Sequence, residues 1–338
     1  MLIFIFFYIL IFILSFKIKK EKFTIFDVIL IFLLIMFSGL RGVGIDYELY
    51  GKIYNSPFQL ESRTGIGFTY LMYLYKYILH LDYQALIFTV SIITILCIYY
   101  FIKKNSERPG LSILIYVSLG FYTTSFNMFR QSLSIALVLV ASHLYNNKKI
   151  FKSILLYCCG FLVHSSSIIA IVAYSIIKKF NNKKIKFKYI LPFSILGLLL
   201  FDKLFMIFIN TFDSYSMYST YNAVPGLGTY INVTLYLLFT VFLLIPKYKN
   251  VNNDDYQYYN LFLIGICIMM LEYKNYLFFR IAFYFIVFSV FMLSNFYIEH
   301  KFQNRKFESL LFYLCLFVYF IIYICSFDGV LPYKMFFM

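Results

Sequence analysis

The chain has 338 residues, of which 62% are hydrophobic and only 13% charged, and its mean hydropathy is +0.80. Soluble globular domains carry about 25% charged residues, so this composition excludes an ordinary soluble domain. The net charge of +15 does not indicate nucleic-acid binding, because the lysines fall in short loops between long apolar runs. The six cysteines lie mostly inside those runs without metal-ligand spacing, which predicts small core residues. We therefore expect an all-α polytopic integral membrane protein.

The first segments set the orientation of the chain. Met1–Phe16 is apolar and is followed by Lys17, Lys19, Lys20 and Lys22. A cleaved signal peptide would carry its charge before the apolar run and a small-residue cleavage site after it. This order therefore predicts an uncleaved first helix with its N-terminus outside, and a second span, Phe23–Leu40, that returns the chain to the outer face.

A polar external loop is predicted for residues 41–64. The next segment, Gly65–Leu79, is short, aromatic and interrupted by Lys76. A segment of this kind favours an interfacial helix over a membrane span.

The remaining spans are oriented by the lysines between them, because short cytoplasmic loops carry an excess of Lys and Arg. The predicted spans are Tyr83–Ile102, Leu111–Phe126, Phe129–Tyr145, Tyr189–Ile209, Thr229–Ile245, Tyr258–Leu271, Leu277–Phe296 and Leu310–Cys325.

One apolar segment, Ile154–Ile177, has lysines at both ends, so a single crossing would violate the orientation rule. It predicts a hairpin of two helices with His164 and three serines at its tip. The total is about 10–12 transmembrane helices, depending on whether both arms of the hairpin cross. No internal repeat is visible, and we predict a single membrane domain over 1–338, with external loops 41–64 and 210–228 and an external tail, 326–338.

The arginines follow a different pattern from the lysines. Of the 30 basic residues only 6 are arginine, and four of these fall at predicted outer ends of spans: Arg41, Arg63, Arg130 and Arg280. A guanidinium group binds phosphate or carboxylate bidentately, so the pattern indicates an anion site, with phosphate as the obvious anion. The alternative for each arginine is that its side chain snorkels to lipid headgroups.

Several ionisable or polar residues share the outer face in this topology, which is where membrane proteins often place a functional site. They are Arg41, Asp46, Arg130, His164, Arg280 and Tyr333. Within Leu40–Tyr50, two glycines let the backbone turn tightly. We expect that turn to aim Arg41 and Asp46 at a common point.

The stretch Leu40–Tyr50, LRGVGIDYELY, resembles the EpsG family of membrane polysaccharide polymerases, which is similar in role to O-antigen polymerases of the Wzy type. The resemblance continues in order through Asn127–Ala136, Gly160–Ile168, Arg280–Phe285 and Leu331–Tyr333. One departure follows the first motif. Family members often have an acidic residue followed closely by glycine, whereas three residues separate Glu61 from Gly65 here, which puts a role for Glu61 in doubt.

The resemblance implies a GT-C-like glycosyltransferase architecture in the bacterial cytoplasmic (inner) membrane, with the active site on the extracytoplasmic side. It implies transfer of a growing glycan from undecaprenyl diphosphate to a lipid-linked repeat unit. The product could be O-antigen, capsule or exopolysaccharide. The expected partners are the lipid-linked oligosaccharides and membrane lipid, with a chain-length regulator as a further candidate.

Arginines can stabilise the departing diphosphate, so neither a metal nor another cofactor is required. The residues implied to bind the substrate are Arg41, Arg130, Arg280, Tyr47, Gln131, Tyr284 and Tyr333. His164 is the candidate base, because the pKa of imidazole is about 6.5, and Asp46 is its rival. With Arg41, these two make up the predicted catalytic set.

Other functions stay open at this point. A metal-dependent glycosyltransferase with a lipid monophosphate donor could use Asp46 and Glu48. A ligase would share the donor chemistry, and a flippase would be expected to show repeat symmetry and charges along a central cavity. A structural membrane partner is the remaining alternative. Tyr215, Tyr218 and Tyr221 fit sugar stacking, or anchoring at the membrane interface.

Overall fold

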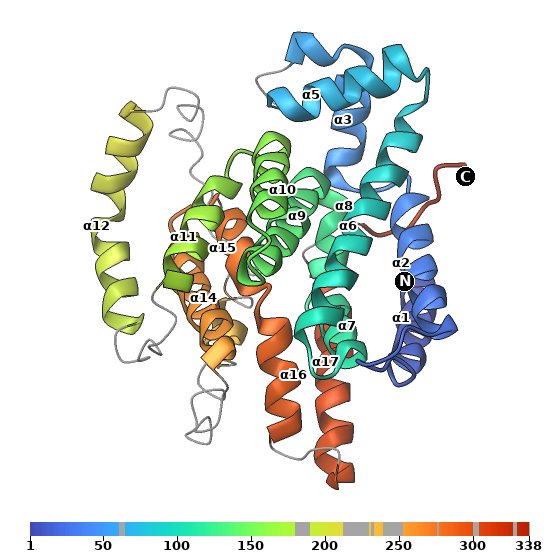
Figure 1. Ribbon diagram of the computed structural model, residues 1–338, viewed down its shortest axis with the longest axis vertical. Coiled ribbons are helices and arrows are strands. Elements are labelled where there is room, and N and C mark those ends of the chain that lie inside the picture. The colour runs from blue at the N-terminus through green and yellow to red at the C-terminus, as the bar shows by residue number, and fades with distance from the viewer. Residues whose placement is uncertain are drawn as a thin grey trace. The chain divides into compact units, whose positions relative to one another are not determined.

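The computed structural model describes residues 1–60, 65–179, 190–211, 230, 233–238, 253–275, 277–299, 304–326 and 330–337 (Figure 1). Within these residues every regular element is a helix, and one isolated antiparallel bridge pairs Arg41 with Met335. The all-α prediction is confirmed. The chain forms two compact units, the first made of Met1–Ile171 with Leu293–Met338 and the second of Val172–Met292.

Some predicted features lie outside the described residues. They are Glu61, Arg63, the lysine-rich segment 180–189, and residues 212–228 with their three tyrosines.

The first unit holds the N-terminal helices and the last one. They are α1 (Leu2–Ser15), α2 (Ile25–Gly39), α3 (Ile45–Asn55), η1 (Pro57–Leu60), α5 (Ile66–Tyr73), the π-helical turn η2 (Leu74–Ile78), α6 (Tyr83–Asn105), α7 (Pro109–Ser118), α8 (Phe121–Asn127), α9 (Phe129–Asn146), α10 (Ile150–Val163) and α17 (Lys306–Ser326). Two further helices contribute to both units: α11 (Ser167–Lys179) and α16 (Ser289–Glu299).

The second unit otherwise contains α12 (Ile190–Thr211), α14 (Asn253–Met270), η5 (Leu271–Tyr273) and α15 (Leu277–Ile286). Its core is aromatic. The Tyr174 hydroxyl donates to the backbone carbonyl of Tyr284, and the Tyr174 ring lies 5.4 Å from that of Phe288. Gly265 allows α14 to approach α15, because a Cβ there would lie 2.8 Å from the Cβ of Phe285.

Three described stretches are long and apolar enough to cross a membrane: Tyr83–Asn105, Phe278–Asn295 and Lys306–Cys325. The first is α6, and the residues at both of its ends stabilise a helix. Asp82 caps it by accepting from the backbone N–H of Ala85 at 2.8 Å, and two lysines fill its last turn. Four further apolar helices are shorter: α1, α2, α7 and α10. The number of membrane spans stays a prediction.

The predicted span Leu111–Phe126 is divided into two helices, α7 and α8. The break lies at Gly120, whose φ is +80°. A Cβ at this position would lie 2.2 Å from the ring of Tyr323 on α17, so glycine permits both the left-handed backbone and the close approach.

The predicted helix break at His164 is confirmed. His164 ends α10 in an extended conformation, with φ −154° and ψ 109°, and α11 begins at Ser167. The two helices have 14 and 13 residues, whereas a full crossing takes about 20. Whether either arm of the hairpin crosses the membrane stays a prediction.

The predicted polar loop 41–64 contains the helices α3 and η1, and its place outside the membrane stays a prediction. The sequence supports a helix there for two reasons. Asp46 and Glu48 occupy the first turn of α3 and Lys52 the last, as the helix dipole favours. Its buried residues, Tyr50, Ile53 and Tyr54, recur at helical spacing. The predicted interfacial segment Gly65–Leu79 is a short helical stretch, formed by α5 and η2.

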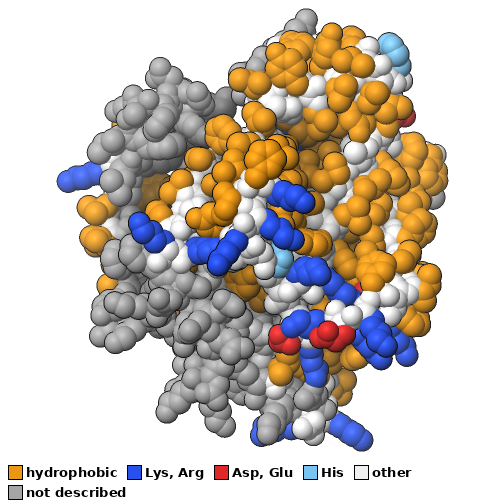
Figure 2. Space-filling model, viewed as in Figure 1, with side chains coloured by type: hydrophobic (Ala, Val, Ile, Leu, Met, Phe, Trp, Pro, Cys, Tyr) orange, Lys and Arg blue, Asp and Glu red, His pale blue; other side chains and the backbone are white. Residues whose placement is uncertain are grey.

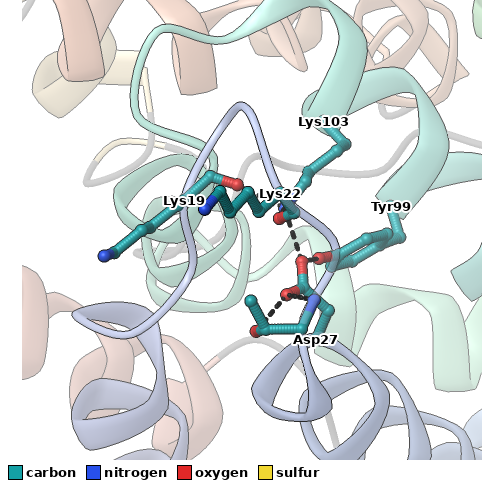
Figure 3. Close-up of polar contacts among 6 residues, drawn as sticks. Lys19, Lys22, Asp27, Tyr99 and Lys103 are labelled. Carbon is teal, nitrogen blue, oxygen red and sulfur yellow. Dashed lines mark hydrogen bonds and ion pairs between the residues drawn. The ribbon is translucent and has the colours of Figure 1, made fainter.

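A buried polar network ties the α1–α2 loop to the far end of α6 (Figure 3). The Asp27 carboxylate accepts from Lys103 Nζ at 2.5 Å, from the Tyr99 hydroxyl, and from the backbone N–H and Oγ1 of Thr24 at 2.8 and 2.6 Å. Lys103 also donates to two backbone carbonyls of the α1–α2 loop. In Figure 2, Lys and Arg side chains lie across the middle and lower parts of the face, and hydrophobic side chains cover most of its upper right part.

Candidate functional site

The junction between α8 and α9 is the centre of the candidate site. Asn127 ends α8, and its Oδ1 accepts from the backbone N–H of Ile45 at 2.8 Å. Ile45 opens α3 and directly precedes Asp46. Gly44, with φ +127°, makes this contact possible, because a Cβ there would lie 2.6 Å from the Phe126 carbonyl oxygen. The start of α3 is therefore fixed against the junction.

Arg41 is buried against the same junction, with 1% of its surface exposed. Its guanidinium carbon lies 5.0 Å from the ring centre of Phe126 and 6.0 Å from that of Phe129. Nη1 donates to the Ser38 carbonyl and, at 3.3 Å, to Ser91 Oγ. Nε is buried and has no hydrogen-bond partner among the described residues. The Nε–H of Arg41 is thus uncommitted within the described part of the chain.

Arg41 stays charged despite its burial. Burial lowers the pKa of its guanidinium to about 10, and the tyrosine hydroxyls around it partly oppose that shift. A pKa of about 10 leaves the group protonated at neutral pH. Its place at the carboxyl end of α2 also suits a cation, because the helix dipole is negative there.

Arg130 lies in the first turn of α9 and joins three helices. Nη1 donates to the Tyr50 hydroxyl on α3 at 2.7 Å, and Nη2 donates to the Val163 carbonyl on α10 at 3.2 Å. The guanidinium carbon lies 5.5 Å from the ring centre of Tyr50 and 5.2 Å from that of Phe68 on α5. The fork of Arg130 therefore connects the middle of α3 to the end of α10.

His164 follows Val163 directly, so Arg130 fixes the backbone one residue before the candidate base. The histidine is partly buried, and its carbonyl accepts from the backbone N–H of Ser167. On the same helix end, Gly67 of α5 approaches so closely that a Cβ would lie 2.4 Å from the Leu162 carbonyl oxygen.

The first unit thus brings four predicted site residues around one junction: Arg41, Asp46, Arg130 and His164. Three more are placed in the same unit. The Tyr47 hydroxyl donates to Gln84 Oε1 at 2.7 Å, the Tyr333 hydroxyl donates to the Phe37 carbonyl at 2.7 Å, and Gln131 is buried beside Arg130 in sequence. Arg280 and Tyr284 lie on α15 in the second unit, and their participation in the site stays a prediction.

The sequence reasoning missed several residues that shape the site: Tyr50, Gln84, Ser91 and Asn127. Tyr50 and Asn127 stand at the edges of the motifs that carry the family resemblance, so those motifs could have pointed to them. Gln84 and Ser91 are polar residues in the apolar helix α6, which is a usable signal of a buried contact. The residues to which Gln84 and Ser91 bind cannot be read from the sequence, because only tertiary packing brings them together.

Among the residues that the structure describes, no three His, Cys, Asp or Glu side chains gather as metal ligands would. The ionisable residues in or next to the segments that meet at the junction are two arginines, an aspartate and a histidine. Such a set can hold an anion and move a proton.

The family model named EpsG family matches residues 24–335 of the chain. No curated protein and no solved structure matches the chain. The matched range begins at Thr24, which caps α2, and ends at Met335, which pairs with Arg41. It covers the whole candidate site, and the family points in general to a membrane polysaccharide polymerase of glycosyltransferase type. The resemblance predicted from the motifs is confirmed, and the chain belongs to the EpsG family.

Proposed function

We propose that the chain is an oligosaccharide repeat-unit polymerase of the bacterial cytoplasmic membrane. It transfers a growing glycan from undecaprenyl diphosphate to a sugar hydroxyl on a lipid-linked repeat unit, at the outer face. The observation that carries this proposal is the α8–α9 junction, which contacts Arg41, the start of α3 with Asp46, and the α10 end with His164 through Arg130.

The arginines suit the departing group. When the acceptor oxygen bonds to the anomeric carbon, the bond to the diphosphate oxygen breaks and negative charge develops on that oxygen. Fixed cations stabilise this charge more in the transition state than in the ground state, which is the requirement for catalysis. Arg41 is buried beside aromatic rings, where a low dielectric strengthens its interaction with an anion.

The acceptor hydroxyl must lose its proton as it attacks. We assign this role to His164, because it stands at a helix end that Arg130 holds in place. Proton transfer by a positioned side chain contributes about 10²–10⁴-fold to a rate. Asp46 remains the second candidate, since the bond from Ile45 to Asn127 fixes the first turn of α3.

Reconstitution tests the proposal. The lipid-linked repeat units that accumulate in a deletion strain would be incubated with the purified protein in liposomes, and product length would be read by gel and mass spectrometry. A ladder of added repeat units, unchanged by a metal chelator, is the expected result.

Other outcomes identify the competing functions. Loss of the ladder on metal removal would favour a metal-dependent transferase. Transfer of finished glycan only to a different acceptor would indicate a ligase. Movement of the lipid across the bilayer without lengthening would indicate a flippase. Any of these three results would overturn the polymerase proposal.

A further inference from the structure

The carbonyl groups at the carboxyl end of α2 need hydrogen-bond donors from outside the helix. The last four carbonyls of an α-helix have no partner within the helix, and in a membrane they cannot rely on water. In α2 these are the carbonyls of Met36, Phe37, Ser38 and Gly39. The Met36 carbonyl accepts from the backbone N–H of Leu40, the residue that follows the helix. The other three carbonyls accept from the side chains of Tyr333, Arg41 and Gln84.

Two of those donors matter for the site. The Ser38 carbonyl is bound by Arg41 itself, through Nη1. The neighbouring Phe37 carbonyl is bound by the Tyr333 hydroxyl at 2.7 Å. The arginine and the C-terminal segment therefore cap adjacent carbonyls of the same helix end.

The backbone of the C-terminal segment also pairs with the residues on both sides of Arg41. Gly42 N–H donates to the Lys334 carbonyl at 2.9 Å, and Phe336 N–H donates to the Leu40 carbonyl at 3.0 Å. A Cβ on Gly42 would lie 3.0 Å from Phe336 Cα, so the two backbones are in direct contact. Figure 1 shows the C-terminal segment beside the end of α2.

Packing holds Tyr333 in this position. Its ring stacks on Phe37 at 4.3 Å between centroids and meets Phe4 of α1 edge-on at 5.7 Å. The side chain is buried, and its hydroxyl proton is used in the bond to Phe37. These contacts suit a residue that fixes the helix end better than one that contacts a glycan.

We propose that residues 330–337 form a clasp that positions Arg41, and that Tyr333 is its main positioning residue. The inference rests on the proposed function for the role of Arg41 in diphosphate binding. Without the clasp, the Phe37 and Leu40 carbonyls lose their donors, and the backbone that carries Arg41 is free to shift. A misplacement of about 1 Å at a reacting centre can cost about 10²-fold in rate.

Two variants loosen the clasp in different ways. Tyr333→Phe removes the hydroxyl and keeps the ring, whereas Phe336→Pro removes the N–H that binds the Leu40 carbonyl. The matched controls are Tyr297→Phe, which removes a hydroxyl bonded to Ser309 on α17, and Phe337→Pro, one residue beyond the pairing. Size-exclusion profiles and thermal unfolding show whether each variant folds.

The first readout is hydrogen exchange at residues 40–42 in the full-length protein, which does not depend on activity. Both clasp variants should exchange faster there, and both controls should match the wild type. Unchanged exchange in both clasp variants would overturn the clasp, whatever the protein catalyses.

The second readout is polymerisation of lipid-linked repeat units. We expect Tyr333→Phe to lower kcat/KM about tenfold to a hundredfold. It should cause no further loss in an Arg41→Lys background that retains some activity, because it acts through Arg41. Equal losses in both backgrounds would assign Tyr333 to the glycan and overturn the positioning role. If the wild type does not polymerise, the proposed function fails, while the exchange readout still decides the clasp.

Discussion

At the scale of single residues, Arg41 and Arg130 use their guanidinium groups differently. Arg130 places one terminal nitrogen on Tyr50 and the other on Val163, so its planar fork connects two helices. Arg41 directs one terminal nitrogen at its own helix end and keeps Nε without a partner among the described residues. An ammonium group cannot reproduce either geometry, since it is a single point charge.

Lysine substitutions follow from this difference. Arg130→Lys should shorten the glycan chains to single repeat units and lower the free energy of unfolding by about 2 kcal/mol, because one charged hydrogen bond is lost. Arg41→Lys and Arg280→Lys should also shorten the chains. Chain length is measured in a complemented deletion strain, and unfolding with the purified proteins. Arg305→Lys, at an exposed ion pair with Glu308, serves as control. Long chains in all three variants would reject the anion site.

The choice of base is also decided by single substitutions. His164→Asn keeps a polar side chain but cannot accept a proton at neutral pH, so the polymerisation rate should fall about 10²–10⁴-fold. Asp46→Asn should retain more activity than His164→Asn. The rates are measured with purified protein and lipid-linked repeat units. The reverse ranking would move the role of base to Asp46 and leave the arginine assignment intact.

The sequence alone singles out Arg41 and Arg130 as candidate site residues, because they break the charge bias that orients membrane helices. Their partners could not be predicted in the same way. Phe126, Ser91 and Val163 come from three other helices, and only the packing of those helices brings them to the guanidinium groups.

At the scale of elements, the unexpected features are the breaks and caps. The apolar pattern over Leu111–Phe126 predicts one helix, and nothing local reveals that it is divided at Gly120. The cause is Tyr323, which lies far along the sequence and fills the space that a side chain at 120 would need. The helix in 41–64 was missed because its polar composition masked a buried face of Tyr50, Ile53 and Tyr54.

Alanine substitutions test the role of the Gly120 break. Gly120→Ala should lower the free energy of unfolding by about 1–3 kcal/mol, because it adds a Cβ at φ +80° against the Tyr323 ring. Gly51→Ala is the matched control. Gly51 lies inside α3 with its nearest Cβ contact at 3.5 Å, so alanine should be neutral or stabilising by about 0.5–1 kcal/mol. Equal stability of the two variants, measured by denaturant unfolding in detergent, would contradict this account.

The two ion pairs of the α1–α2 loop region should contribute very differently. Asp27→Asn removes the charge of a fully buried carboxylate that accepts a hydrogen bond from the partly buried Lys103, and should cost about 3 kcal/mol. Glu107→Gln breaks the Lys20 pair, whose side chains are 67% and 36% exposed, and should cost at most about 1 kcal/mol. Denaturant unfolding in detergent measures both. A larger loss for Glu107→Gln would contradict the structural role of the Asp27 network.

At the scale of the whole molecule, the chain combines family membership with a membrane topology derived from its lysines. The family assignment covers residues 24–335. The topology assigns the His164 turn and the C-terminal segment to the outside, and the lysines at both ends of the α10–α11 hairpin to the inside. The proposed function depends on this predicted topology, because a site for a lipid-linked glycan on the outer face requires His164 and Arg41 to lie on that face.

Cysteine labelling in intact cells decides this topology. Starting from a variant in which the six native cysteines are replaced, single cysteines would be introduced at Ser165, Phe337, Lys148 and Lys179. A membrane-impermeant maleimide should label positions 165 and 337 in intact cells, and 148 and 179 only after permeabilisation. The apolar positions Phe151 and Leu155 of α10 control for reagent access at membrane-facing sites, since both are exposed. Labelling of position 179 from outside would turn α11 into a complete crossing and remove His164 from the site. Labelling of 337 only from inside would place the Arg41 end of α2 in the cytoplasm and reject the proposed function.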